Sequence, residues 1–402
     1  MRMLLGAKWL LVGNIFYAAS QWLILMILAK LGDVEMVGHY TLALSMLAPL
    51  FMFSNLQLRA IQATDAKGEF AFSDFLFLRF LGGMFSMVAC VAVGEWAGVD
   101  NKEVLYVIAL SKGFESFSDI VHGALNVQDR TLEIARSLIF KGLISISSVW
   151  VVLAQGFGLF AAVAFMTIGW LGVLIFQDFR VIGFGLLKIR VISLEKLKKI
   201  LMLSFPLAIS VSLVSLQASI PRYFLNINEG VAAVGIYSAL AYVIIIGSIF
   251  VNAIGQYISP RLAQYWVAAD AQRFNALVFA GLSIAAGAGV LGVVASAIFG
   301  EWFLNVFYGP EYATQSQMMV LLMIGGGFLY MASILGYVLT ATRALRQQVP
   351  IFVLVNIVTV IASMALIPRW GGFGASYVLI VSALTQLILM LYVYKKVMLR
   401  LA

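Results

Sequence analysis

The sequence contains few of the residues from which disulfide scaffolds and zinc sites are built. Among its 402 residues there are one cysteine and two histidines. The single cysteine, Cys90, excludes a disulfide within the chain, and so few thiols and imidazoles argue against a Cys/His zinc site. Charged residues make up only 11% of the chain, against about 25% in ordinary soluble domains. We therefore expect no metal site and no ordinary soluble fold.

Sequence motifs of enzymes are missing as well. The chain contains no HExxH, no P-loop and no GxSxG sequence. A glycosyltransferase or polymerase embedded in a membrane would normally need an acidic, metal-binding or large outer loop. The longest outer segment expected here, around 299–315, is too short for that role. We therefore predict that the protein is not an enzyme, has no catalytic residues and carries no cofactor.

Hydrophobic residues are abundant and make up 63% of the chain. They are grouped in stretches that are each long enough to cross a bilayer of about 30 Å. Twelve such spans are expected, at residues 9–30, 36–58, 76–97, 104–125, 134–154, 157–177, 200–221, 234–258, 275–299, 315–340, 350–368 and 373–394. The predicted fold class is an all-α polytopic membrane protein with twelve transmembrane helices. The first residues lead directly into a span, so we expect no cleavable signal peptide.

The basic residues are distributed unevenly between the two sides of the membrane. With the N-terminus in the cytoplasm, the cytoplasmic segments hold 20 of the 26 Lys and Arg residues, and the outer segments hold 4. Such a bias is the positive-inside signal of membrane proteins, so it predicts that both termini are cytoplasmic. The net charge of +8 then reflects topology, and we expect no nucleic-acid partner.

Two short sequence patterns recur at matching places in the two halves of the chain. Val-Gly-His-Tyr at 37–40 is matched by Val-Gly-Ile-Tyr at 234–237, and Gly-Phe-Gly at 156–158 recurs at 372–374. These matches favour a duplicated plan of six plus six spans, whose halves would be parallel repeats around a central path for substrate. The predicted organisation is an N-terminal lobe, a basic cytoplasmic linker and a C-terminal lobe, at residues 1–178, 179–199 and 200–402.

Five polar residues share one face of the fourth expected span. They are Lys112, Glu115, Asp119, His122 and Asn126, and at 100° per residue they fall within an arc of about 80°. A charge at the centre of a membrane helix costs roughly 2.5–3.5 kcal/mol on the insertion scale. This helix therefore needs partners, or a water-filled cavity, on its charged side.

Two interpretations of the charged face remain open. In the first it is a structural ion-pair network, in which Lys112 pairs with Glu115 and Lys141 of the fifth span meets Asp119. In the second, Glu115 and Asp119 couple transport to H⁺ or Na⁺, or the lysines hold an anionic head group. A hydrogen-bonded structural role suits His122 better than that of a proton switch.

Polar faces also occur on spans 1, 2, 7 and 8. A single Ser, Thr or Asn in a membrane helix ordinarily forms a hydrogen bond to a neighbouring helix. Four such faces in a duplicated bundle favour a hydrophilic central cavity instead. The candidate lining residues are Asn14, Gln21, Ser45, Asn55, Ser215, Tyr242, Asn252 and Gln256.

Four stretches carry a family resemblance: Val-Gly-His-Tyr at 37–40, Leu-Arg-Ala-Ile-Gln-Ala-Thr-Asp at 58–65, Leu-Asn-Val-Gln-Asp-Arg at 125–130 and Val-Phe-Tyr-Gly-Pro-Glu-Tyr at 306–312. With them the chain resembles the O-antigen and oligosaccharide flippases of the polysaccharide transporter family. That family belongs to the multidrug/oligosaccharidyl-lipid/polysaccharide exporter superfamily. The resemblance implies two six-helix lobes that give alternating access to a central cavity.

The resemblance also implies a substrate and a location. Such a protein would carry a polyprenyl-diphosphate-linked oligosaccharide across a bacterial plasma (inner) membrane, for O-antigen, lipopolysaccharide or another surface polysaccharide. Related flippases line the cavity with Arg and Lys, for which the candidates here are Arg59, Lys112, Lys141 and Arg222. These cations suit a lipid diphosphate, while the polyprenyl tail would stay in membrane lipid. A polysaccharide polymerase and chain-length proteins are implied as partners.

Two other functions are compatible with the sequence. One is a cation-coupled multidrug exporter of the same superfamily, for which Glu115 and Asp119 would supply the acidic groups that cationic drugs favour. The other is a non-transporting membrane scaffold for polysaccharide assembly, which would need no polar cavity.

Overall fold

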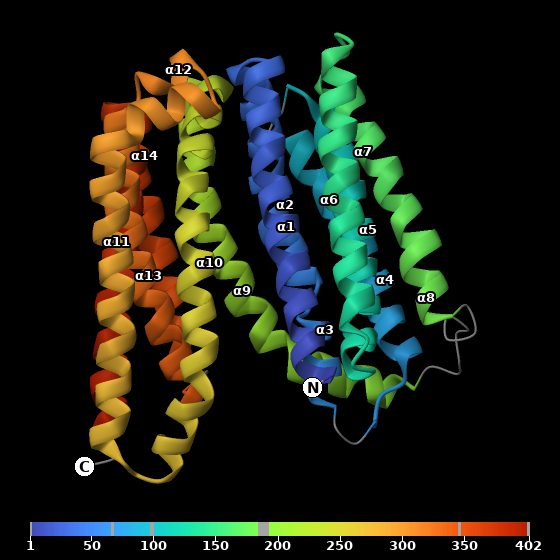
Figure 1. The fold of residues 1–402 in the computed structure, drawn as a ribbon, viewed down its shortest axis with the longest axis vertical. Coiled ribbons are helices and arrows are strands. Elements are labelled where there is room, and N and C mark those ends of the chain that lie inside the picture. Colours follow the sequence, from blue (N-terminus) through green and yellow to red (C-terminus); the bar gives the residue numbers. More distant parts are fainter. Residues whose placement is uncertain (1, 66–67, 97–99, 184–192, 345–346, 400–402) are drawn as a thin grey trace. The chain divides into compact units, whose positions relative to one another are not determined.

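The computed structural model describes residues 2–65, 68–96, 100–183, 193–344 and 347–399, with side chains from Lys8 onward. These residues form helices joined by short connections, and no strand occurs among them (Figure 1). The predicted all-α membrane class is therefore confirmed. Contacts divide the chain into unit 1, Met1–Ser215, and unit 2, Leu216–Ala402. The lobe boundaries stay a prediction, and residues 184–192 of the predicted linker lie outside the described residues.

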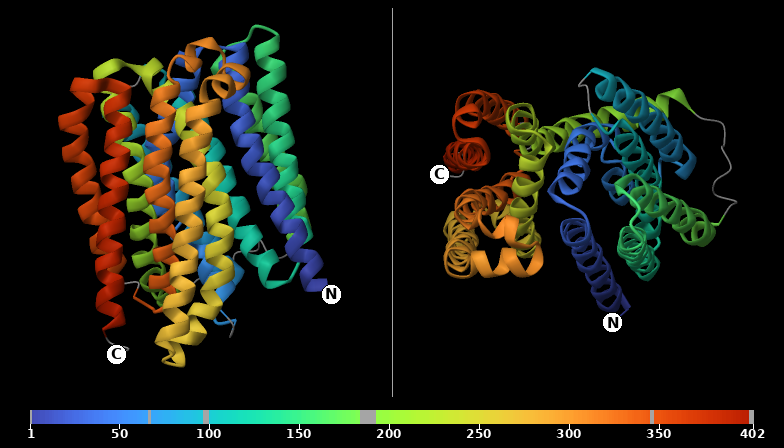
Figure 2. Two further views of the ribbon diagram at one scale, coloured as in Figure 1. Left: turned by 60° about the vertical axis from the view of Figure 1, so that its left-hand side comes forward. Right: turned by 90° about the horizontal axis from the view of Figure 1, so that it is seen from above.

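In unit 1 the long helices run side by side, which three views show (Figures 1 and 2). Its elements are α1 (Arg2–Leu31), α2 (Val34–Ser54), α3 (Leu58–Thr64), α4 (Phe72–Trp96), α5 (Lys102–Val127), α6 (Thr131–Ala154), α7 (Leu159–Val173), the π-helical turn η1 (Leu174–Phe179), α8 (Arg180–Ile182) and the first part of α9 (Leu194–Glu229). Helix α5 contacts α2, α3, α4, α6, α7 and η1. The helix with the charged face is thus surrounded by other helices of its unit.

The described residues of unit 2 form the rest of α9 and five further helices. These are α10 (Val231–Val267), α11 (Ala271–Phe307), α12 (Pro310–Ala313), α13 (Ser316–Ala341) and α14 (Gln348–Met398). Helix α13 packs against α10, α11 and α14. The recurring patterns at 37–40 and 234–237 lie at the same place in α2 and α10, three residues after Val34 and Val231, as a duplication predicts.

Most predicted spans correspond to one helix each. Ten helical segments among the described residues are long and apolar enough to cross a membrane. Helix α5 coincides with the predicted span 104–125 but is not among these ten segments, because Lys112, Glu115 and Asp119 lie within its middle part. Helix α14 covers the last two predicted spans in one run, with non-helical backbone angles at Gly371 (φ 51°, ψ −126°). The chain is a multi-pass membrane protein, and the count of twelve crossings stays a prediction.

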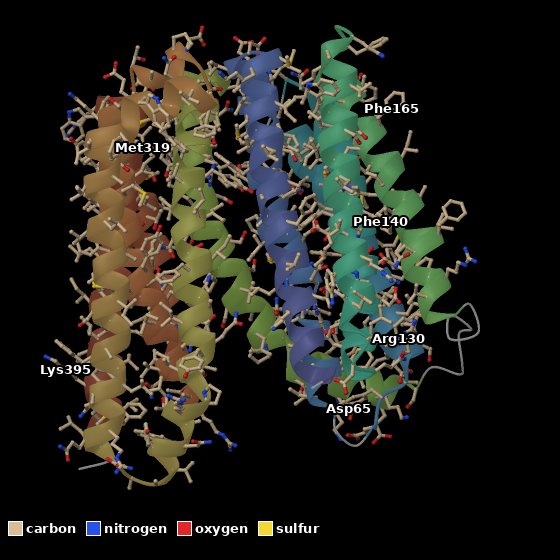
Figure 3. All side chains as sticks on the ribbon, viewed as in Figure 1. Asp65, Arg130, Phe140, Phe165, Met319 and Lys395 are labelled. Atoms are coloured by element: carbon tan, nitrogen blue, oxygen red, sulfur yellow. The ribbon has the colours of Figure 1, made fainter. Side chains whose placement is uncertain are left out.

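The outer surfaces of the helices are apolar. Phe140 on α6 and Phe165 on α7 are 45% and 60% exposed (Figure 3). Val88 on α4 is 67% exposed. In a soluble protein such a surface would be an aggregation hazard, whereas a bilayer solvates it. The exposed apolar residues therefore face lipid.

A break in the backbone separates α2 from α3. Helix α2 ends at Ser54, and the next turn contains Leu56 and Gln57 in the left-handed region, with φ of 51° and 49°. Residues with a Cβ adopt this conformation at a cost of about 1 kcal/mol or more. The break redirects the chain so that α3 starts a new helix, and Arg59 lies in its first turn.

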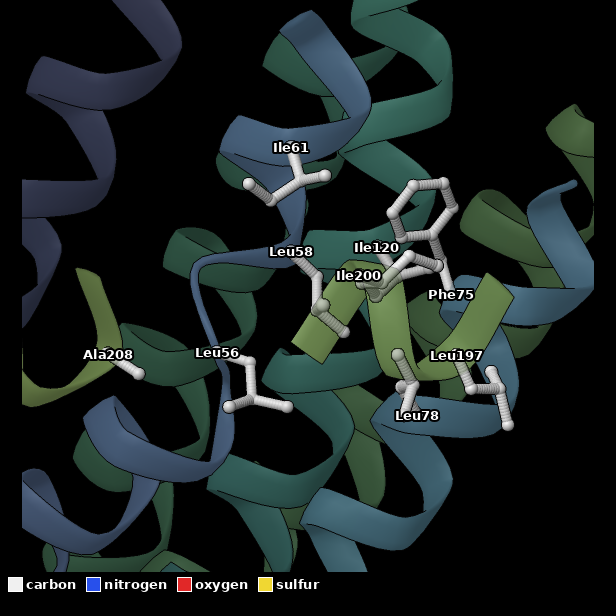
Figure 4. Close-up of a cluster of buried hydrophobic side chains, with 9 residues drawn as sticks. All are labelled: Leu56, Leu58, Ile61, Phe75, Leu78, Ile120, Leu197, Ile200 and Ala208. Atoms are coloured by element: carbon white, nitrogen blue, oxygen red, sulfur yellow. The ribbon is translucent and has the colours of Figure 1, made fainter. Parts of the chain in front are cut away.

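A cluster of buried hydrophobic side chains holds this break in place. Its members come from α3, α4, α5, the α2–α3 connection and the first part of α9 (Figure 4), and they are Leu56, Leu58, Ile61, Phe75, Leu78, Ile120, Leu197, Ile200 and Ala208. Close packing of these side chains gains dispersion contacts between the helices, and these contacts act in a membrane as well. The cluster therefore fixes α3 against α5 and supports the left-handed residues.

Candidate functional site

A cavity of about 610 Å³ lies within unit 1, between α2, α3 and α5. Its apolar wall is formed mainly by α2 and α3, with Leu44, Leu47, Ala48, Phe51, Met52, Ala60 and Ala63. Its polar groups come mainly from α5 and from the connection between α2 and α3, with Asn55, Gln57, Arg59, Lys112, Glu115, Ser116, Asp119 and Asn126. The cavity is thus apolar on one side and charged on the other.

The structure brings four of the five polar residues of the α5 face to this cavity. Lys112, Glu115, Asp119 and Asn126 line it, whereas His122 does not belong to the lining. His122 is at the edge of the predicted arc, and its side chain is buried on another side of α5. The periodicity of the sequence thus located the charged face. The packing of the helices decided that the side chain of His122, at the edge of this face, turns away from the cavity.

Lys112 and Glu115 form an ion pair within α5. The Lys112 Nζ donates to Glu115 Oε2 at 2.7 Å, and the two side chains are 28% and 32% exposed. The Tyr17 hydroxyl on α1 donates to the other carboxylate oxygen, also at 2.7 Å. The pairing of Lys112 with Glu115 that their spacing of three residues predicts is confirmed. The hydrogen bond from Tyr17 connects this ion pair to α1.

Asp119 lies between two arginines. Arg59 of α3 approaches one carboxylate oxygen at 3.3 Å, and Arg79 of α4 approaches the other at 3.1 Å. Arg79 is only 1% exposed, and it also donates to the side-chain oxygen of Asn55. Ser116 donates to the same oxygen at 2.7 Å. The end of α2, α3, α4 and α5 are thereby joined in one polar network beside the cavity.

Trp170 of α7 lies behind the cavity and is 1% exposed. Lys112 and Lys141 place their ammonium groups 5.7 and 5.9 Å from the centre of its ring. Both distances are within the range of cation–π attraction. The indole N–H donates to the Ser145 hydroxyl at 2.9 Å, which fixes the ring. Trp170 therefore contacts one cation of the cavity, Lys112, and one cation of a second, fully buried group of charges, Lys141.

That second group surrounds Asp178, which lies in the π-helical turn η1. Its carboxylate oxygens are 3.6 Å from His122 Nε2 and 3.7 Å from Lys141 Nζ. The three side chains are at most 4% exposed. The prediction that Lys141 meets Asp119 is therefore wrong: Lys141 faces η1, and it does not line the cavity of α2, α3 and α5. A role for Lys141 in binding substrate stays a prediction.

The remaining candidates of unit 1 have more local environments. Asn14 is exposed and donates to the backbone oxygen of residue 10 at 2.9 Å. Ser45 is buried and donates to the backbone oxygen of residue 42 at 2.8 Å. Gln21 and Ser215 are half-buried. Of the predicted polar lining, Asn55 lies at this cavity, and the role of the others stays a prediction.

The candidates of unit 2 lie on α9 and α10. Arg222 donates to the Ser238 hydroxyl at 2.9 Å, and its guanidinium lies 5.6 Å from the centre of the Tyr237 ring. The Asn252 side chain accepts a hydrogen bond from Ser333 of α13 at 2.9 Å. Tyr242 is half-buried and Gln256 is exposed. These contacts stabilise unit 2, and a role for these residues in binding substrate stays a prediction.

Three residues of the site were missed by the sequence reasoning. Arg79 was not singled out from the sequence, yet it is buried against Asp119. Its sequence signal was that it is the one basic residue of the apolar segment Phe72–Trp96. Asp178 and Trp170 carry no periodic pattern of their own. Among the described residues, no group of three or more His, Cys, Asp and Glu side chains has the arrangement of a metal site.

Comparisons with known proteins support a transporter fold. No family model matches the chain. The sequence is 28% identical to the capsular polysaccharide biosynthesis protein CapF of Staphylococcus aureus, over 97% of this chain and 98% of CapF. The fold is similar to the lipid II flippase MurJ in an inward closed conformation, with a TM-score of 0.78 and 12% identity over 98% of this chain and 89% of MurJ.

A similar likeness exists to a multidrug resistance MATE family transporter of the MOP superfamily in its inward-facing conformation. The TM-score is 0.74 and the identity 12%, over 96% of this chain and 98% of the transporter. The chain therefore has the fold of these transporters, and the resemblance noted in the sequence is supported by CapF in sequence and by these two structures in fold.

Proposed function

We propose that the protein is a flippase that carries a polyprenyl-diphosphate-linked oligosaccharide from the cytoplasmic to the outer leaflet of a bacterial plasma membrane by alternating access. The observation that carries this proposal is the pair of cations Arg59 and Lys112. They reach the cavity from α3 and α5 with 34% and 28% of their side chains exposed. A guanidinium binds phosphate oxygens in a bidentate manner and an ammonium acts as a compact charge, so together they suit a diphosphate.

The rest of the cavity fits the same kind of substrate. The amides of Asn55, Gln57 and Asn126 and the hydroxyl of Ser116 offer donors and acceptors for sugar hydroxyls. The apolar wall of α2 suits the first isoprene units, and the remaining tail would stay in membrane lipid. Similarity in sequence to a capsular polysaccharide biosynthesis protein and in fold to a lipid II flippase supports this assignment. A polymerase and chain-length proteins stay predicted partners.

A cation-coupled multidrug exporter is the second candidate. The similarity of the fold to a MATE family transporter and the two carboxylates in the cavity, Glu115 and Asp119, favour it. Both carboxylates have a cation within 3.3 Å, however, so a cationic drug would have to displace a lysine or an arginine. A binding site whose acids are already neutralised is better suited to an anion that competes for the cations.

The two candidates make opposite predictions for a strain that lacks the gene. A flippase strain should accumulate the lipid-linked oligosaccharide on the cytoplasmic face and lose surface polysaccharide. An exporter strain should keep its surface polysaccharide and become sensitive to cationic drugs. Normal surface polysaccharide, in a strain without a redundant flippase, would contradict the proposal.

Complementation by variants then tests the site. The double variant Arg59→Gln, Lys112→Gln should not restore surface polysaccharide although it is present in the membrane, because the diphosphate loses both cations. The matched control is Arg136→Gln, since Arg136 pairs with Glu133 three residues away on α6 and lies outside the cavity. This control should restore the polysaccharide fully. Restoration by the double variant would show that the diphosphate does not bind here.

A further inference from the structure

The charged groups that line the cavity balance each other. Arg59 and Lys112 contribute two positive charges, and Glu115 and Asp119 contribute two negative ones. Arg79 lies behind Asp119, so this group of five carries a net charge of one positive unit. A diphosphate diester carries two negative charges, one on each phosphate. Binding it in the observed state would leave an excess of one negative charge in a site between membrane helices, where unbalanced charge is costly.

The two ion pairs are not equally easy to open. Asp119 accepts from two arginines at 3.3 and 3.1 Å, and one of these, Arg79, is 1% exposed and cannot turn toward water. Neutralising Asp119 would therefore leave a buried cation without its partner, which costs several kcal/mol. Among the described residues, Glu115 has one ion-pair partner, Lys112, whose side chain is 28% exposed. Lys112 has room to turn from the carboxylate toward a ligand in the cavity.

The groups that face Glu115 also favour opening the Glu115–Lys112 ion pair and not those of Asp119. Lys112 and Asp119 lie on its own helix, Tyr17 reaches it from α1, and Lys141 acts on it electrostatically from α6. Lys141 has its own counter-charge in Asp178, at 3.7 Å. A Glu115 that loses its charge therefore sets free one cation, Lys112, while every buried charge around it keeps its partner.

Resting on the proposed function, we propose that Glu115 takes up one proton when the diphosphate of the lipid-linked oligosaccharide binds, so that Lys112 is released to the phosphate. The proton comes from the buffered solvent outside the cavity, so no hydroxide is left behind, and it bonds to Oε2, the oxygen that Lys112 leaves. The ammonium keeps its three protons and donates to a phosphate oxygen instead. The net charge of the five groups becomes two positive units, which matches the diester. When the ligand leaves, the proton returns to water and the ion pair forms again.

This exchange has a structural consequence within unit 1. The Tyr17 hydroxyl donates to the oxygen of Glu115 that does not receive the proton, Oε1. A neutral carboxyl oxygen accepts this hydrogen bond more weakly than a carboxylate does. Protonation of Glu115 therefore loosens the contact between α1 and α5, and the return of the proton restores it. Binding of the ligand in the cavity thereby changes how firmly α1 is held against α5.

Calorimetry of the full-length protein in detergent tests the proposal. The probe is a synthetic farnesyl-diphosphate-linked monosaccharide, which is a diphosphate diester. Titrations at one pH in two buffers with different ionisation enthalpies give the number of protons taken up per ligand. We expect a value approaching one, and an affinity that weakens about tenfold for each pH unit over the range in which uptake occurs.

The variant Glu115→Gln should bind the probe without proton uptake and without this pH dependence. Glu133→Gln is the matched control, because Glu133 also forms an acid–base pair with a residue three positions away, Arg136, but lies outside the cavity. It should behave as the wild type does. The wild-type titration needs no variant, so the test stands even if Glu115→Gln folds poorly.

The outcomes separate this inference from the proposed function. If the wild type binds the probe with no uptake of protons, the inference is overturned and the binding of diphosphate stands. If Glu115→Gln still takes up a proton, another group is responsible and the assignment to Glu115 is overturned. If the wild type does not bind the probe at all, the proposed function itself fails.

Discussion

Replacing Asp119 with alanine should destabilise unit 1 by about 3 kcal/mol. The change leaves the Arg79 guanidinium, which is 1% exposed and 3.1 Å from Asp119, with an amide acceptor but no counter-charge. Removing one partner of a buried ion pair typically costs about 3–5 kcal/mol. The lower end applies here because the Asp119 side chain is 33% exposed to the cavity, where water screens its charge. Arg59, which is 34% exposed, adds little, since it can turn to that water.

Removing both charges should be less harmful than removing one. In the double variant Arg79→Met, Asp119→Ala no buried cation remains without a partner, so the loss should fall to less than half of that in the single variant. Asn55 would lose one donor, but its side-chain oxygen keeps the hydrogen bond from Ser116 at 2.7 Å. The comparison thus separates the cost of an unpaired charge from the loss of side-chain packing.

The chain provides its own probe for this measurement. Cys90 is the single cysteine of the sequence, is 1% exposed and lies on α4, as Arg79 does. A maleimide dye that fluoresces on reacting with a thiol should therefore label the protein only as α4 leaves its place on heating. For a unit of this size, 3 kcal/mol corresponds to a fall of about 6–12 °C in the unfolding midpoint.

A matched control decides how the result is interpreted. Glu133→Gln removes a carboxylate from the pair with Arg136, whose side chain is 53% exposed, so its midpoint should fall by no more than about 2 °C. If Asp119→Ala shifts the midpoint no further than this control, Arg79 is not held by Asp119. If the double variant is as unstable as the single one, the cost is one of packing and the charge argument is refuted.

Three further changes test other parts of the structure by thermal unfolding, which the labelling of Cys90 follows for the two changes in unit 1 and circular dichroism follows for the change in unit 2. Trp170→Phe should cost about 1–2 kcal/mol, because the indole donor and part of the cation–π attraction are lost. An unchanged unfolding midpoint would show that these contacts of Trp170 do not stabilise unit 1. Asp178→Asn should cost about 3–5 kcal/mol, because Lys141, with 2% of its side chain exposed, loses its counter-charge; a neutral result would mean that Lys141 is uncharged. Gly289→Ala should cost about 1–3 kcal/mol, because an added Cβ would lie 2.6 Å from a backbone atom of α13. The control Gly287→Ala, whose Cβ would meet nothing within 4 Å, should cost nothing, and equal losses at the two positions would contradict the close approach of α11 and α13.

Local patterns in the sequence were enough to identify the helices and the charged face. Apolar stretches of span length predicted the membrane helices, because a helix that crosses a bilayer of about 30 Å needs about 20 consecutive apolar residues. The spacing of Lys112, Glu115 and Asp119 placed them on one side of α5, because the helical period is a property of the backbone. The ion pair between Lys112 and Glu115 could be predicted for the same reason, since both residues lie on one helix.

Pairings between helices could not be predicted in this way. Lys141 was expected to meet Asp119, and it meets Asp178 instead. Asp119 in turn is held by Arg59 and Arg79, and Arg79 was not singled out from the sequence. Each of these residues has several possible partners at a suitable depth in the membrane. The partner that each residue meets depends on how whole helices are rotated about their axes. No short sequence pattern predicts that rotation.

The sequence by itself determined that this chain crosses a membrane many times, lacks catalytic motifs and carries charge on one face of α5. These properties follow from hydrophobicity and helical period, which act over a few turns. Only the tertiary structure decided which of those charges reach a cavity and which are neutralised behind it. Tyr17 and Glu115 are 98 residues apart in the chain and 2.7 Å apart in space. The break at Leu56 and Gln57 is what brings Arg59 to Asp119, and it is held by a hydrophobic cluster from five segments of unit 1.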